Sequence, residues 1–239
     1  MHRFFTEPEH VHENHLTVSG DEAKHIKNVL RMQPGDEFIA FDGTGYDYLC
    51  RITDIGTQID AAVLSKELNT TEPGIKVTLY QAYPKSAKME EIVQKAIELG
   101  AVHIVPFIAH RCVKRPPEDS DRLRRVALAA VKQCGRSTLP IVEDVLRFDD
   151  ALKAMKTHDK LVVCWEEERV TPLKQALAGD AANIGVVIGP EGGLEEAEVK
   201  RMREAGGVSV TLGPRIMRTE TAGIAVLAAI FYDKGQMQL

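Results

Sequence analysis

Two glycine-rich phrases near the end of the chain hold the residues best suited to chemistry. The first reads IGPEGG and covers Ile188–Gly193, and the second reads LGPRIMRTETAG and covers Leu212–Gly223. Each phrase follows an apolar, strand-like run and precedes a predicted helix. In α/β proteins, turns at the carboxyl ends of parallel strands are where ligands bind. The two phrases therefore predict two walls of one small-molecule site.

The first phrase suits a neutral or cationic ligand better than a phosphate. Its glycines let the backbone pass close to a ligand, and Pro190 stiffens the turn. A helix is expected from Leu194, and Glu195 and Glu196 give its first turn a negative charge that opposes phosphate binding. No GxxxxGK or GxGxxG motif is present, which disfavours nucleoside triphosphates and dinucleotides. Alone, IGPEGG is better explained as a plain turn between a strand and a helix with a capping glycine.

The second phrase adds a fixed cation beside apolar residues. Ile216 and Met217 offer contact to a flat ring, and Arg218 could meet a carboxylate or an RNA phosphate. Thr219 is a candidate cap for the last helix, with its hydroxyl accepting a backbone N–H. Capping alone would also explain Thr219 and Glu220, so that interpretation stays open beside the functional one.

Length and composition limit the classes of protein to which this chain can belong. The chain has 239 residues, enough for two modest domains, and 44% of them are hydrophobic. The four cysteines are widely spaced and no CxxC occurs, so neither a zinc site nor a redox pair is indicated. No targeting segment is visible, and the longest apolar run, Ile224–Tyr232, is too short to span a bilayer. A cytoplasmic protein without a metal is expected.

The charge distribution is uneven. The net charge is −5, and residues 1–70 hold six Lys/Arg against twelve Asp/Glu. Residues 110–136 instead hold eight Lys/Arg against three Asp/Glu. A basic stretch in an acidic protein could be a footprint for RNA phosphates. A solvated helix face is the alternative, and composition alone favours it slightly.

The hydrophobic pattern changes along the chain. The first 70 residues are rich in β-branched and aromatic residues and predict a small β-barrel with one helix, Asp21–Leu30. Asn69–Gly74 has the composition of a linker. From Ile75 onward, apolar strands alternate with helices, which is typical of a mainly parallel sheet covered on both faces. The last helix begins near Thr219 and is apolar nearly all round, so it is expected to be buried in the core or at a dimer interface.

Together the two phrases resemble the SPOUT class of S-adenosylmethionine-dependent RNA methyltransferases. More narrowly, they resemble the family that methylates N3 of a uridine in 16S ribosomal RNA. The resemblance extends to further stretches: His25–Phe38, Lys88–Phe107, Lys132–Pro140 and Val163–Glu168. It implies a trefoil-knotted α/β domain over residues 71–239 and a PUA-like RNA-binding barrel over residues 1–70. It also implies a homodimer.

The same resemblance implies a pocket for S-adenosylmethionine made by three segments. The implied cofactor-binding residues are Cys164, Trp165, Glu166, Ile188, Gly189, Pro190, Glu191, Gly192, Gly193, Leu212, Gly213, Ile216, Met217, Arg218 and Thr219. Methyl transfer to N3 requires loss of the N3 proton, which a base and a nearby cation would assist. Arg218 is the candidate cation, and Glu191 or Glu220 the candidate proton acceptor.

Basic residues are the candidates for contact with 16S RNA, as free RNA or in the assembled small subunit. The candidate RNA-binding residues are Arg3, Lys24, Arg31, Lys85, Arg111, Arg115, Arg122, Arg125, Gln133 and Arg136. Lys114 and Arg124 lie in the same basic stretch. For the helix arginines, surface residues with solvated head groups are an equally good interpretation.

The chain departs from the family pattern at three positions. Met217 stands where leucine is usual, a change that conserves volume and should be tolerated. Lys132 and Cys134 stand where an acid and a serine are more frequent, which bears on local RNA contacts. Two other functions stay open: methylation of another RNA position such as a ribose 2′-oxygen, and a silent RNA-binding factor of ribosome assembly.

Overall fold

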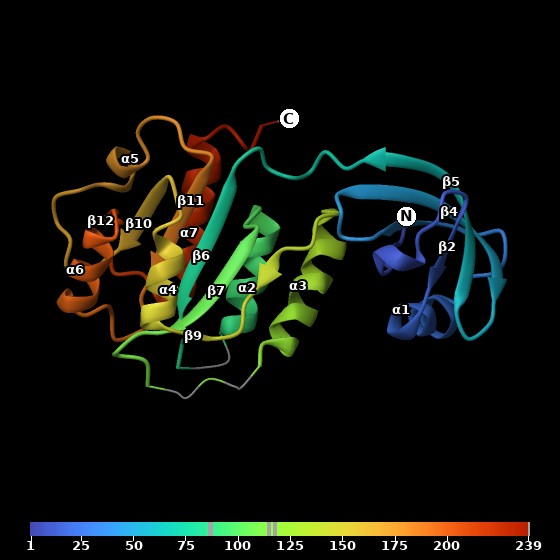
Figure 1. Ribbon diagram of the computed structural model, residues 1–239, viewed down its shortest axis with the longest axis horizontal. Helices are drawn as coiled ribbons and strands as arrows, with labels where there is room; N and C mark the ends of the chain where they lie inside the picture. The colour runs from blue at the N-terminus through green and yellow to red at the C-terminus, as the bar shows by residue number, and fades with distance from the viewer. Residues whose placement is uncertain (86–87, 114–115, 117–118, 239) are drawn as a thin grey trace. The chain divides into compact units, whose positions relative to one another are not determined.

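The computed structural model describes residues 1–85, 88–113, 116 and 119–238. They form two compact units, each built around its own sheet (Figure 1). The N-terminal unit comprises Met1–Glu72 together with Leu128–Leu139, and the larger unit comprises Pro73–Ala127 and Pro140–Leu239.

Five strands form the mixed sheet of the N-terminal unit, in the order β1-β3-β4-β5-β2. β1 pairs in parallel with β3, and the other neighbours are antiparallel. Within residues 1–72 no backbone ladder joins the edge strands, but the hydroxyl of Thr6 donates to the carbonyl of Thr17 at 2.6 Å. The predicted barrel is thus a mixed sheet whose edges are linked by a side chain. The strands are β1 (Arg3–Phe5), β2 (His15–Val18), β3 (Glu37–Phe41), β4 (Tyr46–Ile55) and β5 (Ile59–Leu68).

The helix predicted over Asp21–Leu30 is present in two parts. α1 spans Gly20–Lys24 and runs directly into a π-helix, η2, over His25–Leu30. Ile26 is fully buried in the core of the unit. Ser19 is the N-cap residue, but its side chain makes no capping hydrogen bond. A short 3-10 helix, η1 (Pro8–His10), precedes β2.

The predicted linker, Asn69–Gly74, is anchored at its start by side chains. The amide of Asn69 donates to the carbonyl of Gly135 at 3.0 Å. The carboxylate of Glu72 lies 2.8 Å from the guanidinium of Arg136, which is only 3% exposed. These contacts attach the segment after Leu128 to the N-terminal unit.

Every strand pair in the sheet of the larger unit is parallel. The order is β12-β10-β11-β6-β7-β8, and β9 also pairs with β7. Such a sheet is buried on both faces, which explains the continuously apolar strands. The strands are β6 (Lys76–Ala82), β7 (His103–Ile108), β8 (Ile141–Val142), β9 (Leu146–Arg147), β10 (Lys160–Cys164), β11 (Asn183–Ile188) and β12 (Gly207–Val210).

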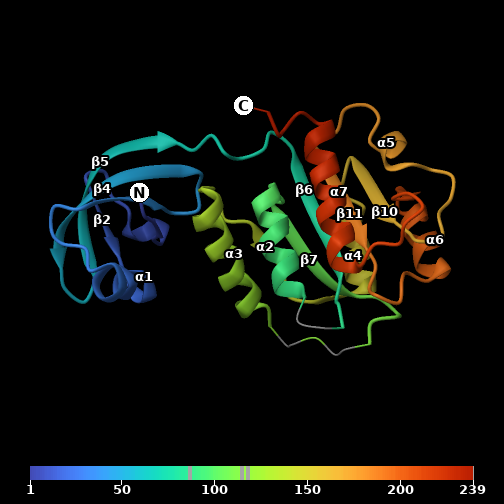
Figure 2. The ribbon, with the colours of Figure 1, turned by 180° about the vertical axis from the view of Figure 1, so that it is seen from behind.

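Helices cover both faces of this sheet, as predicted. α4 lies in front of the sheet in Figure 1, and α2 and α7 lie in front of it in Figure 2, the view from behind. On the first face, Tyr80 and Phe107 share a core with Ala151 of α4. On the other face, α7 brings Gly223 against Ile188. The helices are α2 (Met89–Leu99), α3 (Asp121–Cys134), α4 (Phe148–Met155), α5 (Leu173–Ala176), α6 (Glu196–Glu204) and α7 (Thr219–Asp233).

The last helix is less buried than its apolar composition predicts. Val226, Leu227 and Ile230 of α7 are buried, but Tyr232 is 77% exposed. Ile224 and its apolar neighbours on the outer side are half-buried. No helix among the described residues is both long and apolar enough to cross a membrane.

Strand register sets the position of the candidate site. Cys164, the last residue of β10, pairs with Ile188 of β11 on one side and with Val210 of β12 on the other. Ile188 pairs in turn with Gln81 of β6. Because all four strands are parallel, the segments that follow them leave the sheet at one edge, here called the carboxyl edge.

Candidate active site

Three loops leave the carboxyl edge side by side. The first loop, Trp165–Thr171, follows β10; the second, Gly189–Glu195, follows β11; and the third, Thr211–Arg218, follows β12. β10 lies between β11 and β12, so the first loop is flanked by the other two. The structure therefore brings together the three segments that the family resemblance assigned to one pocket.

The first and second loops interlock at a glycine. Gly193 has φ +75°, a backbone conformation that other residues rarely adopt. A Cβ atom at this position would lie 1.5 Å from Oε1 of Glu166. The indole N–H of Trp165 donates to the carbonyl of Leu194 at 3.4 Å, a long bond that joins the same loops. Glycine is favoured here by its left-handed backbone conformation, and the exposed carboxylate of Glu166 occupies the space that a side chain would take.

Thr219 joins the second loop to the start of α7. Its hydroxyl donates to the carbonyl of Gly189 at 2.6 Å and accepts the amide N–H of Gln81 at 2.9 Å. The N-cap residue of α7 is Arg218, so the expectation that Thr219 caps this helix is wrong. The hydroxyl instead links the start of α7 to the second loop and to β6, which are far away in sequence.

Gln81 was missed by the sequence reasoning. It is fully buried at the end of β6, and its amide also donates to the carbonyl of Ala82 at 3.0 Å. Its Oε1 is buried and has no hydrogen-bond partner among the described residues. An amide side chain in a strand whose other buried residues are mostly apolar was the available signal.

The two candidate proton acceptors have different surroundings. Both carboxylate oxygens of Glu191 lie 3.0 Å from the backbone N–H of Lys85, and the residue is exposed. Glu220 forms an ion pair with Lys88, and its Oε2 is buried without a partner among the described residues. Burial acts to raise the pKa of Glu220, but the hydrogen bond and charge of Lys88 outweigh it, with a smaller effect from the charge of Arg218, and hold that pKa below its ordinary value. Lys88 is a second residue that the sequence reasoning missed.

Arg218 is an available cation of the third loop. The residue is exposed, and its guanidinium makes no hydrogen bond or ion pair with any residue in the described part of the chain. Ile216 is 92% exposed, and Leu212 and Met217 are half-buried. Cys164 is buried, and burial raises the pKa of its thiol to about 12, so it is not a nucleophile at neutral pH.

The candidate RNA-binding residues of the larger unit are of two kinds. Committed side chains already bond to another residue of the protein, and available side chains are exposed without such a bond. Arg122 forms an ion pair with Glu90, and Arg111 donates to the carbonyl of Gly192 at 3.0 Å. The exposed side chain of Arg125 has no partner among the described residues. Lys85 is also exposed. The predicted contacts at Lys114 and Arg115 lie outside the described residues.

In the N-terminal unit, two of the candidate arginines are part of the internal structure. Arg3 lies 2.7 Å from Asp47, and Arg136 is the buried partner of Glu72. Lys24 makes only an exposed ion pair with Asp21 at 2.8 Å, which contributes little to stability. The other two candidates are exposed: Arg31, whose φ is +54°, and Gln133.

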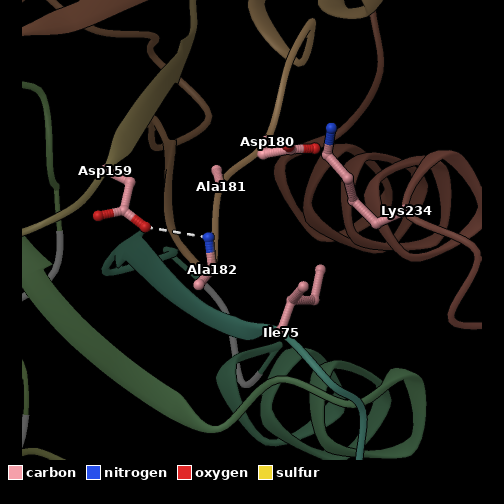
Figure 3. A pocket seen from close by; sticks show the side chains of 6 residues that line it. All are labelled: Ile75, Asp159, Asp180, Ala181, Ala182 and Lys234. Carbon is pink, nitrogen blue, oxygen red and sulfur yellow. Dashed lines mark hydrogen bonds between the residues drawn. The ribbon is translucent and has the colours of Figure 1, made fainter.

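A pocket of about 460 Å³ lies at the opposite, amino edge of the same sheet (Figure 3). Asp159, Asp180 and Lys234 line it together with Ile75 and two alanines. The carboxylate of Asp159 accepts the backbone N–H of Ala182 at 3.0 Å. The ammonium of Lys234 donates to two backbone carbonyls. Since Asp159 and Lys234 already form hydrogen bonds with the backbone, the pocket is a poorer candidate for chemistry than the carboxyl edge.

Comparison with known proteins adds independent information. A family model described as RNA methyltransferase domain matches residues 71–231, and one described as RNA methyltransferase PUA domain matches residues 18–60. The ribosomal RNA small subunit methyltransferase E of Bacillus subtilis is 36% identical over 230 residues, which cover 91% of this chain and 90% of the relative.

Two solved structures resemble the whole chain. One is ribosomal RNA small subunit methyltransferase E from Neisseria gonorrhoeae bound to S-adenosylmethionine, with 32% identity, a TM-score of 0.88 and 97% coverage of both chains. The other is a methyltransferase from Legionella pneumophila in complex with the same cofactor, with 27% identity, a TM-score of 0.81 and 97% coverage of both chains. These likenesses confirm the predicted α/β fold class with an N-terminal PUA-like domain.

Proposed function

Because the chain belongs to the family of RNA methyltransferases that these models describe, we propose that it transfers a methyl group from S-adenosylmethionine to N3 of a uridine in 16S ribosomal RNA. The likeness to the small-subunit enzyme of Bacillus subtilis supports the substrate. The likeness to a Neisseria structure that holds S-adenosylmethionine supports the methyl donor. The observation that carries the proposal is the interlocking of three loops at the carboxyl edge.

The charges around the three loops fit the proposed donor. S-adenosylmethionine carries a sulfonium, an ammonium and a carboxylate. Exposed carboxylates stand in the first and second loops at Glu166 and Glu191, and they suit the two cationic groups of the donor. Ile216 and Met217 offer apolar surface to an adenine ring. When bound, the donor supplies an electrophilic methyl group.

The residues of the chain then have to orient the uracil and manage its charge. The bond between methyl carbon and sulfur breaks as the bond from N3 to that carbon forms, and the N3 proton leaves to an acceptor. Holding the methyl donor and N3 of the uracil in line accounts for a large part of the rate enhancement in such a transfer. We assign to Arg218 the stabilisation of negative charge on the uracil, because its exposed guanidinium makes no hydrogen bond or ion pair with a described residue.

Glu191 is the better of the two candidate proton acceptors. A carboxylate beside an ammonium is a weaker base, because the cation favours its ionised form. Glu220 is in that position next to Lys88. Glu191 is exposed and is hydrogen-bonded by a neutral backbone N–H, that of Lys85. We therefore assign proton removal to Glu191 and an electrostatic part to the pair of Lys88 and Glu220.

RNA contact is assigned to the available cations in preference to the committed ones. In the larger unit these are Lys85 and Arg125, and in the N-terminal unit Arg31 together with Lys24, whose ion pair with Asp21 is exposed. Arg3 and Arg136 are assigned to the internal ion pairs of their unit. The proposed substrate is RNA of the assembled small subunit in the cytoplasm.

A homodimer is part of the proposal. The outer side of α7 carries half-buried apolar residues, Ile224, Ala225 and Ala228, and the exposed Tyr232. A contiguous apolar stripe on a helix is typical of a surface that another chain covers. Light scattering should give twice the chain mass of 26.4 kDa, and a mass of one chain at working concentration would contradict the dimer.

The proposed reaction is tested by analysing modified nucleosides. Small subunits from cells that lack the protein are incubated with purified protein and S-adenosylmethionine, and the RNA is digested for mass spectrometry. N3-methyluridine is the expected product. A 2′-O-methylated nucleoside would instead show ribose methylation, and absence of cofactor binding by calorimetry would favour an RNA-binding assembly factor.

Arg218→Ala separates binding from chemistry. The variant should bind S-adenosylmethionine within about threefold of the parent and transfer methyl groups at least about tenfold more slowly, an increase of about 1.4 kcal/mol in the barrier. Single-turnover kinetics at saturating cofactor measure the second effect. Arg215→Ala, which removes an exposed arginine of the same loop, is the matched control. Unchanged turnover in Arg218→Ala would remove this residue from the mechanism.

A further inference from the structure

Glu168, in the first loop, is bonded to several parts of the larger unit at once. Its Oε1 accepts the backbone N–H of Val170 at 2.9 Å and that of Arg169 at 3.1 Å. Its Oε2 accepts the hydroxyl of Ser209 at 2.6 Å and the guanidinium of Arg203 at 3.2 Å. The side chain is only 11% exposed. Charge-assisted hydrogen bonds of this number fix both the carboxylate and the turn around it.

The partners of Glu168 belong to different elements. Ser209 lies on the edge strand β12, and Arg203 lies near the end of α6. The guanidinium carbon of Arg203 is 5.4 Å from the centre of the Trp165 ring, and the backbone N–H of Trp165 donates to the carbonyl of Val210 at 3.2 Å. The start of the first loop is therefore clamped between β12 and α6.

The clamp is electrostatic as well as geometric. The hydroxyl of Ser209 and the N–H of Val170 lower the pKa of Glu168 to about 2. The carboxylate is therefore charged at any working pH. A glutamine of the same shape would present an NH₂ group to one set of donors, either the backbone N–H groups or Ser209 and Arg203, and those donors would lose their acceptor.

We propose that Glu168 is a positioning residue for the cofactor site. By tying the first loop to β12 and α6, it holds Trp165 and Glu166 where Glu166 meets Gly193 of the second loop. Glu168 makes its contacts on the side of β12 and α6 and acts on the cofactor through the loop. This inference rests on the proposed function, because it takes the three loops as the binding site for S-adenosylmethionine.

Glu168→Gln is compared with Glu167→Gln in the full-length protein. Glu167 is the exposed neighbour, and its side chain has no partner among the described residues, so it controls for loss of charge. Calorimetry with S-adenosylmethionine should give a Kd at least about tenfold higher for Glu168→Gln and within about twofold of the parent for Glu167→Gln. Ser209→Ala removes one donor and should give an intermediate increase of about threefold.

Trp165 supplies a local signal, because it is the only tryptophan of the chain. In Glu168→Gln its fluorescence should be quenched more easily by acrylamide than in the parent, while Glu167→Gln should match the parent. A residue that only stabilised the fold would lower the melting temperature without moving this signal or the Kd below that temperature.

Each outcome decides the inference. A folded Glu168→Gln variant with parent-like Kd and parent-like quenching would overturn it. If Glu168→Gln does not fold, Ser209→Ala decides: a Kd raised about threefold supports the clamp, and an unchanged Kd overturns it. Failure of the parent itself to bind S-adenosylmethionine would overturn the proposed function and this inference together.

Discussion

The two edges of the parallel sheet in the larger unit use their polar groups differently. At the amino edge, the carboxylate of Asp159 accepts the backbone N–H groups of Ala182 and Asn183, at 3.0 and 2.9 Å. The ammonium of Lys234 donates to the carbonyl of Leu177 at 2.6 Å. The carboxylate therefore fixes the start of β11 and the ammonium fixes the segment after α5, so both charges stabilise the fold.

At the carboxyl edge, polar groups bond one loop to another. The hydroxyl of Thr219 meets Gly189, and the carboxylate of Glu166 fills the space beside Gly193. The guanidinium of Arg218 and the apolar side chain of Ile216 are left exposed. A pocket at the amino edge is therefore a weaker sign of function than polar groups that shape loops and leave charges available.

Gly193→Ala is expected to have the largest effect on the carboxyl edge. The left-handed backbone conformation costs a non-glycine residue roughly 1–2 kcal/mol, and the carboxylate of Glu166 would also have to move away from the new methyl group. The affinity for S-adenosylmethionine should fall by up to about thirtyfold, which calorimetry measures. Gly206→Ala is the matched control, because Gly206 has φ +95° and a Cβ atom there would meet no other atom within 4 Å.

A second change tests the collision itself. If the carboxylate of Glu166 causes the loss, Glu166→Ala combined with Gly193→Ala should recover part of the affinity that Gly193→Ala loses. A cofactor affinity for Gly193→Ala equal to that of Gly206→Ala would show that the interlocking of the loops does not matter for binding.

Thr219→Val should have the next largest effect. The variant keeps the shape of the side chain but leaves the carbonyl of Gly189 without its donor and the amide of Gln81 with one acceptor fewer. An unsatisfied buried group costs about 1–3 kcal/mol. Cofactor affinity should fall about tenfold by calorimetry. Thr221→Val, exposed two residues further along α7, should bind as the parent does; equal affinities for the two variants would contradict this role of Thr219.

A change at the amino edge should affect stability and leave cofactor binding alone. His158 contacts the hydroxyl of Tyr80 and the side chain of Asn183, both at 2.8 Å. Burial lowers the pKa of His158, and the hydrogen bond to Asn183 opposes this only in part. The unfolded chain thus takes up the proton first, and the stability from a neutral His158 is complete above about pH 6.5 and is lost as the pH falls below it.

The measurement is the melting temperature from pH 8 to pH 5. The melting temperature of the parent should fall below about pH 6.5, by about 2–4 °C for each kcal/mol lost from its free energy of unfolding. The melting temperature of His158→Gln should fall less over the same range. His12→Gln, at an exposed histidine, should keep the parent's dependence. Cofactor affinity at pH 7.5 should be the same in all three proteins. A tenfold change in the cofactor affinity of His158→Gln would contradict the claim that the amino edge serves stability alone.

Two arginines of one helix should give the smallest effect. Arg125 is available, whereas Arg124 bonds to Asp121 at 2.8 Å and to Asp144 at 2.7 Å. Arg125→Ala should reduce the slope of log affinity for RNA against log salt by ~0.7, the value for one phosphate contact to a single strand. Arg124→Ala should change the slope less. An equal change in both would mean that ion pairing within the protein does not decide which cations meet RNA.

The position of the three loops could be predicted because it depends on local sequence. Glycine-rich phrases directly after apolar strands must leave a parallel sheet at its carboxyl edge, whatever the strand order. The order β12-β10-β11 then places these loops side by side. The trefoil knot stays a prediction of the family resemblance.

The residues that link the loops could not be predicted, because their roles depend on partners far away in sequence. Gln81 is 138 residues from Thr219, and Glu168 is 41 residues from Ser209. Arg136 looked like an RNA contact because it belongs to a basic stretch, yet the fold buries it against Glu72. Charge patterns show which residues are cations, and only the fold shows which of them are already paired.

The most direct measurement is a crystal structure of the protein grown with S-adenosylmethionine. Electron density for the cofactor is expected between the three loops, in contact with residues of Ile188–Gly193 and Leu212–Arg218. Density in the pocket lined by Asp159 and Lys234, or three empty loops at saturating cofactor, would contradict the proposed site.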